Sequence, residues 1–231
     1  MGVTFASPGR DPLGERIARA EAHDPDRVVR ALEPMVTASR RARLREVISR
    51  RLSSVSVLFD RPYDPHNGAA IVRSCEAFGV HRLHVIKRPG VEFALARSVA
   101  RGAEKWVDVV HHRSFESALA WAEADGTVLV GADPAGELVP DDLSAFPRVG
   151  VVVGSEREGI ARDFVAACAA RVRVPMRGFV ESLNVGVTAA ILVHAATRGR
   201  PGDLDVEAQR RLYARGLYLS VPHAEEVLAA G

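Results

Sequence analysis

The segment VGVVVG at residues 149–154 constrains the fold of this chain more than any other part of the sequence. It carries no polar side chain, so a strand formed here is apolar on both of its faces. Such a strand is typical of the centre of a parallel sheet that is covered by helices on both sides. The segment therefore predicts an α/β fold, provided that helices alternate with further strands.

Strand-like and helix-like segments do alternate along most of the chain. The predicted strands are 55–59, 83–86, 106–110, 127–132, 149–154 and 172–174. The predicted helices between and after them are 67–78, 93–101, 114–124, 160–170 and 182–197. This order predicts a parallel sheet with helices on both faces.

The two ends of the chain are expected to lie outside the sheet. Residues 1–25 show no sustained period and are expected to be poorly ordered or to form an extension, followed by helices at 26–36 and 40–52. The last residues predict two short helices around Gly216 and Pro222. We therefore expect an N-terminal segment 1–52, a sheet domain 53–200 and a C-terminal helical tail 201–231.

Bulk composition is that of an ordinary soluble protein, with 47% hydrophobic and 26% charged residues in 231. Because it lacks a run of about 18 apolar residues or a secretory signal, we expect a cytoplasmic protein without a membrane span. Cys75 and Cys168 are expected to be reduced core thiols, and the adjacent His111 and His112 to be surface residues. No metal site is expected, since neither a His/Cys cluster nor paired carboxylates occur at ligand spacing.

The segment SRRARLREVISRR at 39–51 is strongly basic, with six arginines against the single Glu46. Arginine presents a planar fork of donors that matches phosphate, so this helix is a candidate RNA contact. The alternative is a solvated helix whose apolar residues, such as Leu44 and Ile48, face a core. The candidate RNA-binding residues are Arg40, Arg41, Arg43, Arg45, Arg50 and Arg51.

The segment DPHNGAAIVRSCEAFG at 64–79 places a permanent charge, Arg73, on a helix otherwise suited to burial. Its neighbours at helical spacing are alanines, which leave space around the guanidinium, as an anion site needs. A structural explanation is also open, because Glu76 lies three residues away and Asn67 can cap the helix.

Two further loops are expected at the same edge of the sheet, where strands lead into helices. The loop in VVVGSEREGI (151–160) has the glycines of a close turn but not the lysine and hydroxyl of a nucleoside-triphosphate loop. The loop in VPMRGFVESLNVGVTAAILVHAA (174–196) brings Ser182 and Asn184 to the start of a helix. Three such loops at one edge predict a ligand site there.

Taken together, these three segments resemble the ordered motifs of the SPOUT superfamily of RNA methyltransferases, and of its TrmH branch in particular. The resemblance covers residues 40 to 200. It implies transfer of a methyl group from S-adenosylmethionine to an RNA ribose 2′-hydroxyl, a deep trefoil knot in the C-terminal part of the sheet domain, and a homodimer with the active site at its interface. The basic helix and the C-terminal tail look most like those of enzymes that modify guanosine 18 in the tRNA D-loop.

The resemblance also implies roles for individual residues. The implied catalytic residues are Arg73, Asn67, Glu156, Ser182 and Asn184. The implied cofactor-binding residues, which act largely through their backbone, are Ala132, Gly154, Val174, Met176 and Leu183. Ala132 stands where some relatives have threonine, so a hydroxyl contact is lost there. The alternatives are a ribosomal RNA methyltransferase of the same family or a non-catalytic RNA-binding module.

Overall fold

The computed structural model describes residues 12–88, 96–155 and 157–230. These residues form two compact units. One runs from Leu52 to Arg200 and contains the sheet, and the other is made of helices from the two ends of the chain.

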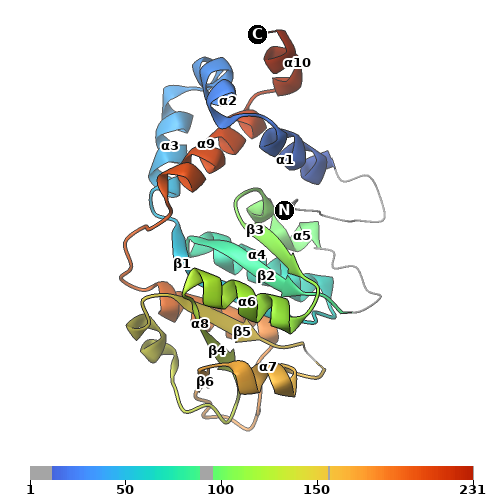
Figure 1. Ribbon diagram of the computed structural model, residues 1–231, viewed down its shortest axis with the longest axis vertical. Helices are drawn as coiled ribbons and strands as arrows, with labels where there is room; N and C mark the ends of the chain where they lie inside the picture. The colour runs from blue at the N-terminus through green and yellow to red at the C-terminus, as the bar shows by residue number, and fades with distance from the viewer. Residues whose placement is uncertain (1–11, 89–95, 156, 231) are drawn as a thin grey trace. The chain divides into compact units, whose positions relative to one another are not determined.

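The sheet unit contains six parallel strands in the order β3-β2-β1-β5-β4-β6 (Figure 1). The strands are β1 (Leu52–Asp60), β2 (Val80–Ile86), β3 (Asp108–His112), β4 (Val128–Ala132), β5 (Val149–Val153) and β6 (Ala170–Val172). Every residue of β5 is buried, and β5 lies between β1 and β4. The predicted parallel sheet and its central strand are therefore confirmed.

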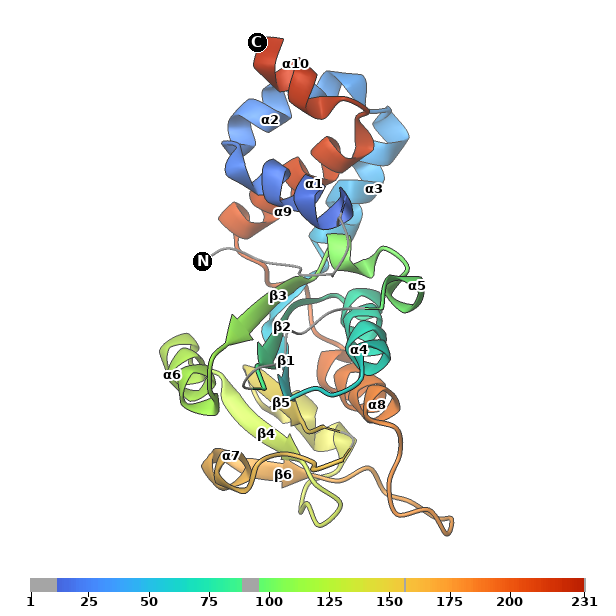
Figure 2. The same ribbon diagram turned by 90° about the vertical axis from the view of Figure 1, so that its right-hand side faces the viewer.

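Helices cover both faces of this sheet (Figure 2). On one face lie α4 (Pro65–Ala77) and α8 (Val185–Thr197), with the short α5 (Arg97–Ala100), η2 (Ala103–Lys105) and η3 (Pro140–Ala145). On the other lie α6 (Phe115–Asp125) and α7 (Arg162–Ala167). Beneath α6 and α7 lies a core of buried apolar side chains, which includes Leu58, Ile86, Ala118, Ala122, Leu129, Val152 and Phe164. Burial of each larger side chain contributes about 2 kcal/mol.

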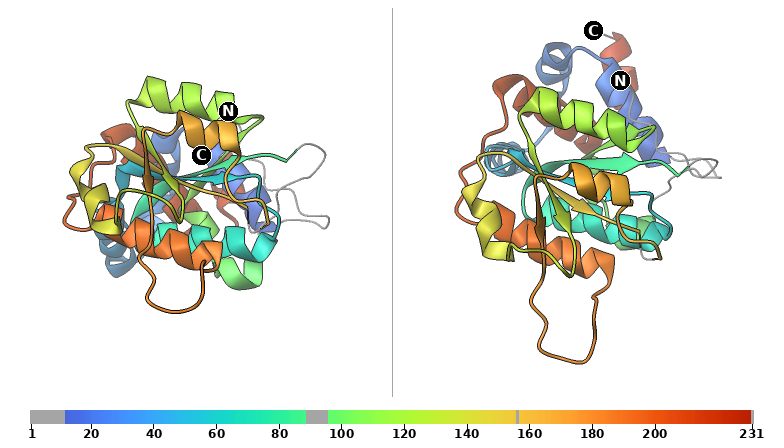
Figure 3. Two further views of the ribbon diagram at one scale, coloured as in Figure 1. Left: turned by 90° about the horizontal axis from the view of Figure 1, so that it is seen from below. Right: turned by 60° about the horizontal axis from the view of Figure 1, so that its bottom comes forward.

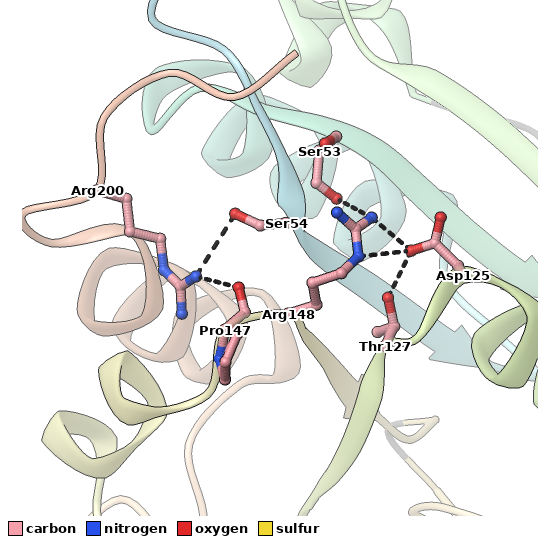
Figure 4. Close-up of polar contacts among 7 residues, drawn as sticks. All are labelled: Ser53, Ser54, Asp125, Thr127, Pro147, Arg148 and Arg200. Carbon is pink, nitrogen blue, oxygen red and sulfur yellow. Dashed lines mark hydrogen bonds and ion pairs between the residues drawn. The ribbon is translucent and has the colours of Figure 1, made fainter. Parts of the chain in front are cut away.

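Polar contacts tie together the amino ends of the strands (Figure 4). The carboxylate of Asp125 accepts hydrogen bonds from Thr127 at 2.6 Å and from Arg148, which also donates to the carbonyl of Ser53 at 3.2 Å. Arg200, which follows α8, donates to the carbonyl of Pro147 at 2.8 Å and thereby holds the segment before β5. The amino edge of the sheet is thus fixed by the protein's own side chains.

The second unit contains α1 (Pro12–Ala22), α2 (Pro25–Leu32), η1 (Glu33–Met35), α3 (Ala38–Ile48), α9 (Val206–Ser220) and α10 (Ala224–Ala230). The long helix α9 packs against α1, α2 and α3. Within this unit the ion pair of Arg215 with Glu21, at 2.5 Å, joins α9 to α1.

The expectation that the first 25 residues are poorly ordered was wrong for residues 12–22, which form a helix whose short apolar face, Ile17 and Ala20, is buried in the unit. The two predicted C-terminal helices are confirmed: α9 and α10 lie on either side of Pro222, and α9 continues through Gly216, which is buried in its interior. A glycine costs a helix about 1 kcal/mol relative to alanine, and tertiary packing outweighs that cost here.

The expectation that His112 is a surface residue was also wrong. His112 is buried, and its Nε2 lies 2.9 Å from Nδ1 of His84 on the neighbouring strand β2. The ring of Trp121 on α6 stacks on His84 with 3.6 Å between ring centroids. Burial, together with the neighbouring His112, lowers the pKa of His84 to about 3, and burial also lowers the pKa of His112.

The His84 cluster predicts a loss of stability in mild acid. Since the folded pKa is lowered, the unfolded chain binds more protons than the folded one between pH 6.5 and pH 3, so stability is lost as pH falls through this window. From pH 7 to pH 5, His84 alone accounts for a loss of about 2 kcal/mol. We expect His84→Phe to remove that part of the pH dependence, measured by urea unfolding followed through Trp121 fluorescence. The control His194→Gln, at an exposed histidine on α8, should keep the wild-type dependence; an equal dependence in His84→Phe would contradict the assignment.

Candidate active site at the carboxyl edge of the sheet

The carboxyl ends of β1 and β5 lie side by side, since Phe59 pairs with Val153 in the parallel register. The end of β6 lies beside that of β4, where Ala132 pairs with Val172. The three loops that the sequence singled out therefore leave the same edge of the sheet, which we call the carboxyl edge. The third of them, 173–184, extends away from the sheet as an open loop (Figure 3).

Asp60 joins the first two loops and was missed by the sequence analysis. Its carboxylate is buried at the end of β1 and accepts the backbone N–H of Ala161 at 2.8 Å. The guanidinium of Arg61 lies 3.4 Å from the same oxygen. A buried charge is tolerated only when it is paired and hydrogen-bonded, so Asp60 fixes the end of β1 against the loop after β5. The signal in the sequence was a carboxylate directly after the apolar run VLF.

The loop after β5 is a tight turn that requires its glycines. Ser155 and Gly159 exchange backbone hydrogen bonds of 3.1 and 3.0 Å, and Gly159 has a φ of +65°. A Cβ atom on Gly154 would lie 2.0 Å from the carbonyl carbon of Gly159, so no larger residue fits. Glu156 lies outside the described residues, and its catalytic role stays a prediction.

Asn67 and Asn184 connect the first and third loops. Asn67 is 8% exposed, and its Oδ1 accepts a hydrogen bond of 2.9 Å from Nδ2 of Asn184. The Oδ1 of Asn184 in turn caps α8 by accepting the N–H of Gly186 at 2.8 Å. The amide of Asn184 thus donates to one segment through Nδ2 and accepts from another through Oδ1.

The suggestion that Asn67 caps its helix was wrong. Asp64 is the N-cap of α4, and its carboxylate accepts the N–H of His66 at 2.8 Å. The helix begins at Pro65, two residues earlier than predicted, because proline is well suited to the first turn. Asn67 is therefore free of the capping role and holds Asn184 instead.

Arg73 lies six residues beyond Asn67 on α4, roughly 9 Å further along the helix axis. Its side chain is exposed, and it makes no hydrogen bond or ion pair with the part of the chain that the structure describes. The local ion pair with Glu76 is therefore not formed. Ser182 is also exposed, in the loop two residues before Asn184. The guanidinium and the hydroxyl are both accessible to a ligand.

The predicted cofactor residues lie at the ends of β4, β5 and β6. Ala132 closes β4, Gly154 follows β5, and all five residues are partly exposed. The backbone groups of four of them make no hydrogen bond with the described residues: Gly154, Val174, Met176 and Leu183. Free, accessible backbone donors and acceptors at neighbouring strand ends fit a ligand that carries amino, carboxylate and adenine groups.

The predicted RNA-binding arginines lie on or just after α3 in the helical unit. Arg51 is 1% exposed, so its side chain is not available on the surface. Arg43 and Arg50 each pair with Glu46, and Arg45 pairs with Glu33. These three and Arg40 are exposed, while Arg41 is partly exposed. Leu44 and Ile48 are buried, so α3 has both a core face and a basic surface.

Known proteins resemble this chain in both sequence and fold. The family model described as "SpoU rRNA Methylase family" matches residues 54–194. The tRNA (guanosine(18)-2′-O)-methyltransferase of Escherichia coli (strain K12) is 30% identical over 81% of this chain and 79% of its own length. The chain belongs to the SpoU family of RNA methyltransferases.

Solved structures agree with this membership. The TrmH/SpoU tRNA modifying enzyme of A. aeolicus has a TM-score of 0.71 and 27% identity, over 80% of this chain and 98% of its own. The SpoU methyltransferase AviRb of Streptomyces viridochromogenes, in complex with AdoMet, has a TM-score of 0.56 and 28% identity, over 65% and 60% of the two chains. The sheet unit therefore has the α/β fold of this family.

Two features are absent from the described residues. None of their helices is long and apolar enough to cross a membrane. They also contain no group of three or more His, Cys, Asp or Glu residues placed to hold a metal ion.

The Asn67–Asn184 pair predicts different costs for two substitutions at one position. Asn184→Ala removes the helix cap and leaves Asn67 without this partner, so we expect it to lower the free energy of unfolding by about 2 kcal/mol. Asn184→Asp keeps an acceptor for the cap and loses only the donor, so its cost should be about half as large. Urea unfolding of both variants provides the measurement. Equal losses would show that the cap contributes nothing, and no loss in Asn184→Asp would show that the pair contributes nothing.

Proposed function

We propose that this chain methylates the ribose 2′-hydroxyl of guanosine 18 in the tRNA D-loop, with S-adenosylmethionine as donor. The observation that carries the proposal is the hydrogen bond between Asn67 and Asn184, formed at the start of the helix that also carries the exposed Arg73. It joins the first and third motifs at the edge where ligands bind in this type of sheet. The E. coli relative, named for guanosine 18, matches most of the chain, including residues outside the sheet unit.

A ribosomal RNA target is the alternative, because the family description names rRNA. The match in length to tRNA-modifying relatives favours tRNA: the A. aeolicus structure aligns over almost its whole chain. A non-catalytic RNA-binding module is disfavoured because such a module has no need of accessible Arg73 and Ser182 next to the Asn67–Asn184 pair.

In the proposed mechanism Arg73 stabilises the negative charge that develops on the 2′-oxygen as the hydroxyl proton passes to solvent water. S-adenosylmethionine, when bound, supplies the electrophilic methyl group. A guanidinium holds its protons too tightly to be a good general base, whereas a fixed cation near a developing oxyanion lowers the barrier directly. The exposed Ser182 positions the substrate phosphate, and Asn67 fixes the start of α4, from which Arg73 projects. We assign Asn184 and Glu156 to shaping the pocket around the donor.

The family resemblance supports three further parts of the proposal. We propose that the segment 173–184 belongs to a trefoil knot that holds the donor through the backbone of Val174, Met176 and Leu183. We also propose that two copies of the chain form a dimer with the active site at the interface. Finally, the segment 1–52 is proposed to contact tRNA through exposed arginines of α3, which neutralise phosphates.

The target is tested by methylation of an unmodified tRNA transcript with labelled S-adenosylmethionine. We expect one 2′-O-methyl group at guanosine 18, located by nuclease digestion and mass spectrometry. A transcript with adenosine at position 18 is the matched control and should remain unlabelled. Labelling of ribosomal RNA alone would refute the tRNA target and leave the reaction class intact.

The role of Arg73 is tested by Arg73→Ala. Because the guanidinium makes no contact within the described chain, its removal should leave stability and donor affinity unchanged while methylation falls by at least a hundred-fold. Calorimetric titration with S-adenosylmethionine and single-turnover kinetics give the two readouts. Arg73→Lys keeps the charge and should recover part of the rate if charge stabilisation is the role; retained turnover in Arg73→Ala would exclude this residue from the mechanism.

A further inference from the structure

An exposed tyrosine at the carboxyl edge lies among three arginines. Tyr63, in the loop after β1, is 49% exposed. The guanidinium carbon of Arg157, from the loop after β5, lies 3.8 Å from the centre of its ring. The guanidinium carbon of Arg88, just after β2, lies 5.5 Å from the same centre. Three loops that are distant in sequence thus converge on one aromatic ring.

A single carboxylate links two of these loops. Glu158 Oε2 lies 3.2 Å from Nη1 of Arg61 and 3.7 Å from Nη2 of Arg88. Arg61 also approaches the buried Asp60, and it adopts a φ of +47°, which is unfavourable for a residue other than glycine. We call Arg61, Tyr63, Arg88, Arg157 and Glu158 the Tyr63 cluster. Among the described residues its three positive charges face two carboxylates, Glu158 and the buried Asp60, so one positive charge remains in excess.

The cluster lies next to the proposed catalytic residues. Tyr63 precedes Asn67 by four residues, and β1 is bonded to both β2 and β5, whose loops supply the arginines. The side chains of Arg61, Arg88 and Glu158 are 30%, 25% and 49% exposed. Within the Arg88 guanidinium, Nε and Nη2 are buried, so a phosphate reaches this Nη2 only once Glu158 has moved. An accessible ring with surplus positive charge has the chemistry of a surface that binds single-stranded nucleic acid.

We infer that Tyr63 is the stacking site for an unpaired base of the RNA substrate, and that Arg61, Arg88 and Arg157 bind the phosphate next to that base. The inference rests on the proposed function for the presence of RNA at this edge. Guanidinium groups and aromatic rings are both stacking partners for unpaired bases. A phosphate matches the two guanidiniums that Glu158 now holds, so binding of the RNA displaces this carboxylate. Tyr63 is thereby a substrate-binding residue, distinct from those that act on the 2′-hydroxyl.

The ring is tested by comparing Tyr63→Leu with Tyr63→Phe. Tyr63→Leu should weaken the binding of an unmodified tRNA transcript roughly ten-fold, since it removes one base–aromatic stack. Tyr63→Phe keeps the ring and should bind within about two-fold of wild type. Fluorescence anisotropy with labelled tRNA measures binding without relying on turnover. Calorimetry with S-adenosylmethionine should give the wild-type affinity for both variants.

Glu158→Gln is expected to change tRNA affinity in the opposite direction to Tyr63→Leu. Removal of the competing carboxylate should tighten tRNA binding by about three-fold, because the ion pairs it breaks are partly exposed and weak. Glu123→Gln, which removes an exposed carboxylate on α6, is the charge-matched control and should change binding little. If the cluster only holds the loops together, Glu158→Gln will instead weaken binding or lower the thermal stability.

The outcomes separate this inference from the proposed function. Wild-type methylation at guanosine 18 with unchanged tRNA binding in Tyr63→Leu would overturn the inference and leave the function standing. Altered tRNA binding in Tyr63→Leu and Glu158→Gln, without methylation by the wild type, would support the inference and refute the function. A fall in S-adenosylmethionine affinity in Tyr63→Leu, without a change in tRNA binding, would assign the ring to the donor pocket and overturn the inference.

Discussion

The complete burial of β5 is the constraint on which the sheet unit depends. A strand of five apolar residues without an exposed edge needs neighbours on both sides and helices on both faces. Parallel neighbours are connected by helices that cross over the sheet, and each crossover begins at a carboxyl end. Consequently the loops after β1, β5 and β6 all leave one edge, and residues more than a hundred positions apart in sequence come together there.

The two edges of the sheet are used differently. At the amino edge, arginines donate hydrogen bonds to acceptors of the protein itself: Arg148 binds Asp125, and Arg200 binds backbone carbonyls. At the carboxyl edge Arg61 and Arg88 share one exposed carboxylate, and on α4 the exposed Arg73 makes no hydrogen bond or ion pair with the described residues. A guanidinium that is hydrogen-bonded to acceptors of its own protein stabilises the fold. One with few such acceptors can bind a phosphate or a developing anion.

Hydrogen bonds of buried polar groups fix the positions of the loops at the candidate site. Asp60 is compensated by the N–H of Ala161, and Asn67 by the amide of Asn184. Each of these bonds crosses between segments distant in sequence, so each fixes a loop that local propensity leaves open. The cost of an unmatched buried polar atom exceeds the gain from a typical hydrogen bond, and that asymmetry makes such pairs position-specific.

The sequence by itself determined the fold class and the approximate strands and helices, because hydrophobic period and turn chemistry are local properties. Its motifs also pointed to Asn67, Arg73, Ser182 and Asn184 through their resemblance to a known family, and the catalytic roles of these residues stay predictions. It did not determine that α9 passes through Gly216, that His112 is buried against His84 and Trp121, or that Arg51 is buried. It also did not indicate Asp60 or the Tyr63 cluster. All of these depend on which segments meet across the sheet or within the helical unit. These tertiary contacts depend on packing and on the pairing of buried charges and amides. The groups concerned come within bonding distance only in the folded chain.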